Sequence, residues 1–124
     1  MMDTPFASAR RIVVKTGSAL VVENGQPRHD WLAKLASDIV SFRLRGFQVV
    51  LVSSGAVALG RQSVAASVAN RLDQKQAAAA IGQPRLMSAI SAAFAPHDVT
   101  IGQALLTLSD TETRRRWLNA RATL

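Results

Sequence analysis

Hydrophobic residues near the start of the chain change from a strand-like run to a helix-like spacing. Residues 12–14 form a short β-branched run, and a turn-rich stretch follows at 23–27, which predicts a first strand that ends in a loop. From Asp30 onward, apolar side chains recur three and four positions apart, with Asp30 placed to cap a helix and Gly46 to end it. The apolar positions of this predicted amphipathic helix are Leu32, Leu35, Ala36, Ile39 and Phe42.

A second apolar run follows this helix directly. Residues 47–52 are apolar except for Gln48, which is typical of a strand covered on both faces, as strands of parallel sheets are. A strand, a helix and another strand in immediate succession form one βαβ unit, whose crossover we expect to be right-handed. The chain is therefore predicted to be an α/β protein with a parallel sheet.

The middle of the chain predicts several helical segments. Residues 56–62 are expected to begin a helix, 63–70 to form a polar connection, and 73–81 to form another helix. The pair at 82–83, Gly-Gln, is expected to break that helix, and Pro84 is well placed as the first residue of the next one. This next helix carries Leu86, Ile90, Ala93 and Phe94 on one side and should end at Pro96.

The carboxyl-terminal part of the chain predicts one more strand and one more helix. Residues 99–107 are the expected third strand. Ser109 and Glu112 have the spacing of a capping box, so a last helix should begin there. The chain reaches Leu124 without a glycine, proline or other stop signal. We therefore interpret the sequence as cut within a helix.

The composition fits a single packed domain. The chain has 124 residues, of which 48% are hydrophobic and 19% charged, enough to bury a core and too apolar for a disordered chain. Residues 1–11 lack the apolar core of a secretory signal, and we expect them to form a flexible tail. No apolar run approaches the length that crosses a bilayer. The absence of cysteine is consistent with a reducing, cytoplasmic setting.

The charge and the isolated aromatic and histidine residues select no partner by themselves. A formal net charge of +7 raises nucleic acid, anionic lipid and anionic small molecules as partners. The arginine run 114–116 either faces a phosphate-rich partner or is a solvated helix surface. His29 and His97 lack metal-ligand spacing, so we expect surface histidines and no metal site. Trp31 and Trp117 are expected to serve in packing rather than in base stacking.

Two similar stretches follow the first two predicted strands, Lys15-Thr-Gly-Ser18 and Ser53-Ser-Gly-Ala56. In open parallel sheets, ligands gather at the carboxyl ends of the strands, where loops meet helix amino termini. Gly17 and Gly55 would let the backbone come close to a ligand, and the neighbouring N–H groups can donate to anionic oxygens. The two corners together are therefore interpreted as a cradle for anions.

Lys15 adds a full positive charge beside the first of these glycines. This combination is expected where a phosphoryl group is held and its developing charge is stabilised. The alternative is a solvated lysine at the end of a strand, since the stretch is neither a Walker A loop nor a dinucleotide-binding glycine motif. Ser54 and Gly55 similarly fit either a binding site or an ordinary strand-to-helix turn with a serine cap.

Five segments in order, 13–18, 49–60, 75–83, 102–107 and 117–124, resemble a known family, the glutamate 5-kinases of the amino-acid kinase superfamily. The first segment is shared by the whole superfamily. The Ser-Ser-Gly-Ala-Val-Ala-Leu-Gly, Lys-Gln and Leu-Asn-Ala-Arg elements are more specific. They separate this family from the carbamate, acetylglutamate and uridylate kinases.

The resemblance implies a three-layer αβα sandwich with a mainly parallel sheet, and transfer of the γ-phosphoryl group of ATP to the side-chain carboxylate of L-glutamate. This reaction gives glutamyl 5-phosphate, the first step of proline biosynthesis. By position, Lys15 would be catalytic and bind the ATP phosphates with Gly17, while Ser54 and the amides of Gly55 and Ala56 would bind glutamate. Mg²⁺ would enter bound to ATP. Full-length members are expected to be cytoplasmic homo-oligomers without membrane or nucleic-acid partners.

The sequence also departs from the family. The family usually has leucine where Thr16 stands and often serine or threonine near Ala19. In the family, an acidic and asparagine-rich segment completes the glutamate site, and the loops for adenine and a second lysine come later still. Residues 12–124 thus resemble the amino-terminal, glutamate-binding part of such a kinase, and we expect this chain alone to be inactive or marginally folded. The alternative is a non-catalytic α/β module that keeps the glutamate corner or binds an anionic polymer through its arginines.

Overall fold

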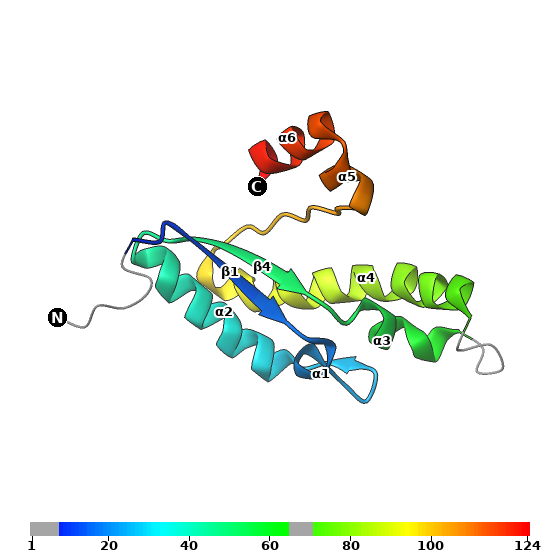
Figure 1. Ribbon diagram of the computed structural model, residues 1–124. Coiled ribbons are helices and arrows are strands. Elements are labelled where there is room, and N and C mark those ends of the chain that lie inside the picture. Colours follow the sequence, from blue (N-terminus) through cyan, green and yellow to red (C-terminus); the bar gives the residue numbers. More distant parts are fainter. Residues whose placement is uncertain (1–7, 65–70) are drawn as a thin grey trace.

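A computed structural model describes residues 8–64 and 71–124 (Figure 1). Most of the predicted connection at 63–70 lies outside these residues. In chain order the elements are β1 (Arg11–Thr16), α1 (Ser18–Val21), β2 (Val22–Glu23), β3 (Gln26–Pro27), α2 (His29–Leu44), β4 (Gln48–Ser53), α3 (Ala56–Gly60), the 3₁₀ turn η1 (Arg61–Ser63), α4 (Leu72–Phe94), the 3₁₀ turn η3 (Ala95–His97), α5 (Leu108–Glu112) and α6 (Arg114–Thr123).

The predicted strand, helix and strand unit is confirmed. β1 and β4 form a two-stranded parallel sheet, with a continuous register from Arg11 opposite Gln48 to Thr16 opposite Ser53. The helix between them, α2, begins at His29 and ends where Gly46 adopts a φ of 92°. Asp30 lies in its first turn, and Arg28 occupies the N-cap position that we expected for Asp30. A separate short hairpin joins β2 to β3.

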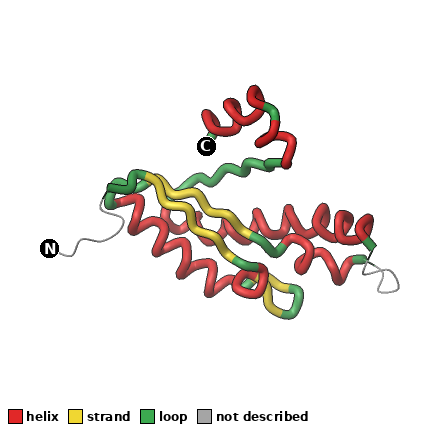
Figure 2. The backbone as a smooth tube through the Cα atoms, in the orientation of Figure 1, coloured by secondary structure: helices red, strands yellow, loops and turns green. Residues whose placement is uncertain are grey.

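The core lies on one side of the parallel sheet, where α2 and α4 pack against each other (Figure 2). Val49 and Leu51 of β4 contact this core together with buried residues of the two helices. The opposite side carries Val13, which is 62% exposed, and Val52, which is 46% exposed. The prediction of a strand covered on both faces is therefore wrong for the described residues. They form an α/β arrangement with a two-stranded parallel sheet, and the expected αβα sandwich is not confirmed.

The expected break at 82–83 is wrong, because α4 runs without interruption from Leu72 to Phe94. Gly82 serves close packing: a Cβ atom there would overlap the backbone carbonyl of Ala56, and a Cβ atom on Gly60 would overlap that of Ala78. The backbones of α3 and α4 touch at this point. Pro84 removes one helix hydrogen bond, but the buried residues on both sides of it hold α4 against the core. These are Ala78 and Gly82 before it, and Leu86, Ala89, Ile90 and Phe94 after it.

The predicted third strand at 99–107 is also wrong. Residues 99–106 have no strand pairing, and a strand is stable only when its backbone groups bond to a neighbour. Val99 and Ile101 still pack against the core, whereas Leu105 is 75% exposed. The segment leads away from the sheet toward α5 and α6 (Figure 1).

The last helical region begins earlier than expected and is divided in two. Thr107, rather than Ser109, is the N-cap of α5. Its N–H and its hydroxyl both donate to the Asp110 carboxylate, at 2.6 and 2.7 Å. These bonds, the backbone one foremost, lower the pKa of the Asp110 carboxyl below its usual 3.8. Thr113 then ends α5 and begins α6.

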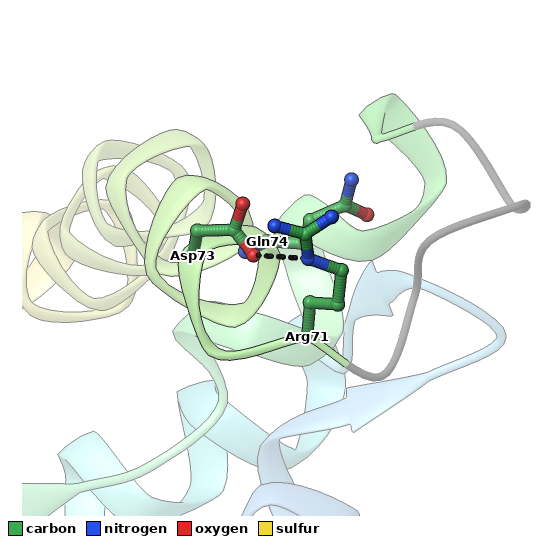
Figure 3. Close-up of polar contacts among 3 residues, drawn as sticks. All are labelled: Arg71, Asp73 and Gln74. Atoms are coloured by element: carbon green, nitrogen blue, oxygen red, sulfur yellow. Dashed lines mark hydrogen bonds and ion pairs between the residues drawn. The ribbon is translucent and has the colours of Figure 1, made fainter.

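The amino-terminal end of α4 is a polar surface. Arg71 and Asp73 form an ion pair with 3.4 Å between Nε and Oδ1, both side chains being largely exposed (Figure 3). Such an exposed pair contributes little to stability. Gln74 follows in the same turn, and its Oε1 is buried without a partner among residues 8–64 and 71–124. No helix in those two ranges combines the length and the apolar character needed to cross a membrane.

The contact between α3 and α4 generates a prediction at Gly82. An alanine in an exposed helix stabilises it relative to glycine by about 1 kcal/mol. Here we expect the opposite, because the added methyl group meets the rigid backbone of α3. Gly82→Ala should lower the free energy of unfolding by about 2 kcal/mol or more in urea titrations. Gly102→Ala is the control, since a Cβ there meets nothing within 4 Å; equal stability of the two variants would contradict the packing account.

Candidate functional site

The two predicted corners lie next to each other at one rim of the sheet. The arrowheads of β1 and β4 both point toward α1 and α3 (Figure 1), as parallel pairing requires. The pairing continues beyond the last strand residues, because the N–H of Ser54 donates to the carbonyl of Thr16 at 3.1 Å. The sequence therefore correctly predicted that both corners would share the carboxyl edge of the sheet.

The first corner leaves β1 through Lys15 and Gly17. Lys15 is exposed and lies opposite Val52 on the outer side of the sheet. Gly17 precedes α1 with a φ of −77°, and a Cβ atom on it would meet nothing within 4 Å. Any residue could therefore adopt this backbone conformation. The missing side chain at Gly17 leaves free space next to Lys15.

The second corner is more constrained. Ser54 is exposed, Gly55 is buried, and Ala56 is the first residue of α3. Gly55 has a φ of 127°, and a Cβ atom on it would lie 3.0 Å from Cγ2 of Val22. Only glycine adopts this conformation readily. The carbonyl of Gly55 accepts the N–H of Leu59 at 3.0 Å, so the chain turns from strand into helix at this residue.

Two hydroxyl groups join the corners, and we did not identify them from the sequence. The Thr16 hydroxyl donates to Oγ of Ser53 at 3.2 Å, and the Ser53 hydroxyl donates to the carbonyl of Ser54 at 3.2 Å. Thr16 is buried, with 3% of its surface exposed. A polar residue at the last inward position of each paired strand was the signal that could have revealed this contact.

The short helix α3 is held from its other end by α4. Nη1 of Arg85 donates to the carbonyl of Leu59 at 3.0 Å, which satisfies a carbonyl at the end of α3. Leu59 is fully buried beside Gly60. Arg85 was not among the predicted site residues, because its partner lies twenty-six positions away in the chain. The second corner therefore rests on α4 through both Arg85 and the glycine contact.

The other residues considered from the sequence do not join the rim. Trp31 is half-buried against the core, as expected for packing. Trp117 is 42% exposed, with the Arg121 guanidinium 5.3 Å from its ring centroid. The arginines at 114–116 are exposed on α6, which packs on α5 away from β1 and β4 (Figure 1). Across the described ranges, no three His, Cys, Asp or Glu side chains gather where they could hold a metal ion.

Comparison with known proteins gives this arrangement a context. A sequence profile described as "Amino acid kinase family" matches residues 10–124. The chain is 51% identical, over 98% of its length, to a glutamate 5-kinase of Paramagnetospirillum magneticum. It is 52% identical over 94% of its length to that of Cereibacter sphaeroides, and 53% identical over 95% to that of Caulobacter vibrioides. The chain spans about a third of the length of each of these relatives.

The two glycines of the corners should respond differently to the same substitution. Gly55→Ala forces an unfavourable φ and a close contact with Val22, so we expect it to lower the free energy of unfolding by about 1–3 kcal/mol. Gly17→Ala should leave stability within about 0.5 kcal/mol, because its backbone is ordinary and its surroundings are open. Thermal unfolding followed by circular dichroism measures both. A Gly17 variant as unstable as the Gly55 variant would contradict the geometry of the two corners.

Proposed function

The chain belongs to the amino acid kinase family, and we propose that the protein acts as a glutamate 5-kinase. In this reaction the γ-phosphoryl group of ATP is transferred to the side-chain carboxylate of L-glutamate. The observation that supports the proposal best is the shared rim, where a lysine corner and a serine-glycine corner leave adjacent parallel strands. Two anionic substrates that must react with each other need neighbouring sites of this kind. The similarity to several glutamate 5-kinases supports the choice of substrate.

We assign the phosphate side to Lys15 and Gly17. Lys15 is an exposed cation at the rim, and its ammonium group would contact the ATP phosphates and the phosphoryl group during transfer. The space beside Gly17 would let the backbone come close to the same phosphates. Phosphoryl transfer is catalysed mainly by positioning and by stabilising negative charge. A lysine at this position supplies the charge, and it is the catalytic residue of the proposal.

We assign the glutamate side to Ser54, Gly55 and Ala56. The Ser54 side chain is exposed at the rim and can hydrogen-bond to the amino acid. The amides of Gly55 and Ala56 lie at the start of α3, where N–H groups have no partner within the helix. They would donate to a carboxylate oxygen of glutamate. The positive φ of Gly55 would thus turn these amides toward the ligand.

The reaction needs no general base. A glutamate side chain has a reference pKa of about 4.3, so its carboxylate is already ionised at neutral pH. The obstacle is repulsion between this carboxylate and the phosphates, which Lys15 and the backbone amides reduce. Mg²⁺ would arrive bound to ATP and add positive charge to the phosphates. We assign the ion no protein ligand.

The remainder of the site is proposed from the relatives, which are about three times as long as this chain. Residues that hold adenine and complete the glutamate site would come from the part of such kinases that this chain does not cover. We therefore expect the 124-residue chain alone to be inactive. We place the full enzyme in the cytoplasm and in a homo-oligomer, and its product would enter proline biosynthesis.

Lys15→Ala tests the phosphate side in the full product of the gene that encodes this chain. Loss of one key electrostatic group should lower the rate of acyl phosphate formation about a hundredfold or more. The product is measured by trapping with hydroxylamine in the presence of ATP and glutamate. Lys34→Ala, which removes an exposed lysine of α2, should retain the wild-type rate. Unchanged turnover in the Lys15 variant would remove this residue from the mechanism.

Ser54→Ala tests the glutamate side in the same assay. The variant should raise KM for glutamate by about tenfold, the scale of one lost hydrogen bond to a charged group, and change KM for ATP much less. Ser91→Ala removes an exposed serine on α4 and serves as the control. A defect confined to ATP would contradict the assignment of this corner to glutamate.

A further inference from the structure

The inward side of the parallel sheet is apolar until its last pair of residues. Ile12 lies opposite Val49 and Val14 opposite Leu51, and the pair that ends the ladder is Thr16 with Ser53. Thr16 is the buried polar residue of the described core. A hydroxyl group removed from water costs free energy unless it finds a hydrogen-bond partner. Here its partner is the Ser53 hydroxyl at 3.2 Å, which is itself half-buried.

This contact belongs to a closed ring of hydrogen bonds between the two corners. The Thr16 hydroxyl donates to Ser53 Oγ, and the Ser53 hydroxyl donates to the carbonyl oxygen of Ser54 at 3.2 Å. The N–H of Ser54 returns to the carbonyl of Thr16 at 3.1 Å. Both the N–H and the carbonyl of Ser54 are therefore tied to the end of the sheet, while its side chain stays exposed.

The carbonyl of Ser54 and the N–H of Gly55 belong to one peptide unit. The described chain contains no cis peptide bond, so the two groups of this planar unit point in opposite directions. The bond from Ser53 to the Ser54 oxygen therefore also fixes the direction of the Gly55 N–H. We propose that Thr16 and Ser53 are positioning residues that aim the Gly55 amide at the amino-acid substrate. This inference rests on the proposed function for the identity of that substrate.

Gly55 is where such a restraint is needed. Without a Cβ atom, glycine allows many backbone conformations, so Gly55, with a φ of 127°, does not by itself fix the orientation of the peptide before it. The hydrogen bonds among Thr16, Ser53 and Ser54 restrain this peptide to one orientation. Each O–H···O distance exceeds the usual 2.7–2.8 Å, so we expect each bond to contribute a modest amount. The link from Ser53, which touches the Ser54 carbonyl directly, should matter more than the link from Thr16.

The test uses Ser53→Ala and Thr16→Val in the full gene product. Ser53→Ala should raise KM for glutamate about five- to tenfold and Thr16→Val about threefold, within the range of one net hydrogen bond. KM for ATP should change less than about twofold. Ser53→Thr keeps the hydroxyl group and should retain a wild-type KM for glutamate. Ser41→Ala removes a hydroxyl that bonds within α2 and is the control.

Two results would overturn the proposal. One is an unchanged KM for glutamate in Ser53→Ala; the other is an equal rise in both KM values, which would indicate general loss of packing. Hydrogen exchange of the Gly55 amide gives a readout that does not need catalysis. The exchange rate of this amide should change in Ser53→Ala and stay the same in Ser41→Ala. If the wild-type protein makes no acyl phosphate, the proposed function fails, and the ring of hydrogen bonds is then supported or refuted by the Gly55 exchange alone.

Discussion

The parallel pairing of β1 with β4 is the constraint on which the rest of the site depends. Because parallel strands end at the same edge, the register that places Thr16 opposite Ser53 also places the two following loops side by side. The pairing extends one residue further, through the amide of Ser54. A slip of one residue would turn the inward residues outward and would shift the lysine corner relative to the serine-glycine corner. The arrangement of the candidate site therefore depends on the register between β1 and β4.

The second corner needs additional support, and α4 provides it. Gly60 and Gly82 let the backbones of α3 and α4 touch, while Arg85 bonds to the carbonyl of Leu59. A helix of five residues is not stable alone, so this external support keeps its first turn in place beside Gly55. The first corner has lighter support, from Arg28, which donates to the carbonyls of Ala19 and Val21 in α1. It also needs less, since Gly17 has an ordinary backbone conformation. The rigid corner is the one that we assign to the smaller substrate, whose recognition depends on a few directed hydrogen bonds.

Local patterns in the sequence predicted the parts of the fold that local forces determine. The spacing from Leu32 to Phe42 specified α2, and the apolar run at 47–52 specified β4. Gly82 was misread because its role is tertiary: the glycine serves contact with another helix, and nothing nearby in sequence shows this. The segment 99–106 has the composition of a strand and lacks a neighbour to pair with among the described residues. The shared rim could be predicted from strand order, whereas the Thr16–Ser53 bond required the register.

In the proposed function, the two corners bind two different anionic reactants at adjacent places. The most direct measurement is a pair of NMR titrations on the ¹⁵N-labelled full gene product, with glutamate alone and with a non-hydrolysable ATP analogue alone. We expect glutamate to shift the Gly55 and Ala56 amides and the ATP analogue to shift the Gly17 amide, each set responding mainly to its own ligand. Glutamate-induced shifts that avoid Gly55 and Ala56, or a Gly17 amide that does not respond to the ATP analogue, would contradict the proposal.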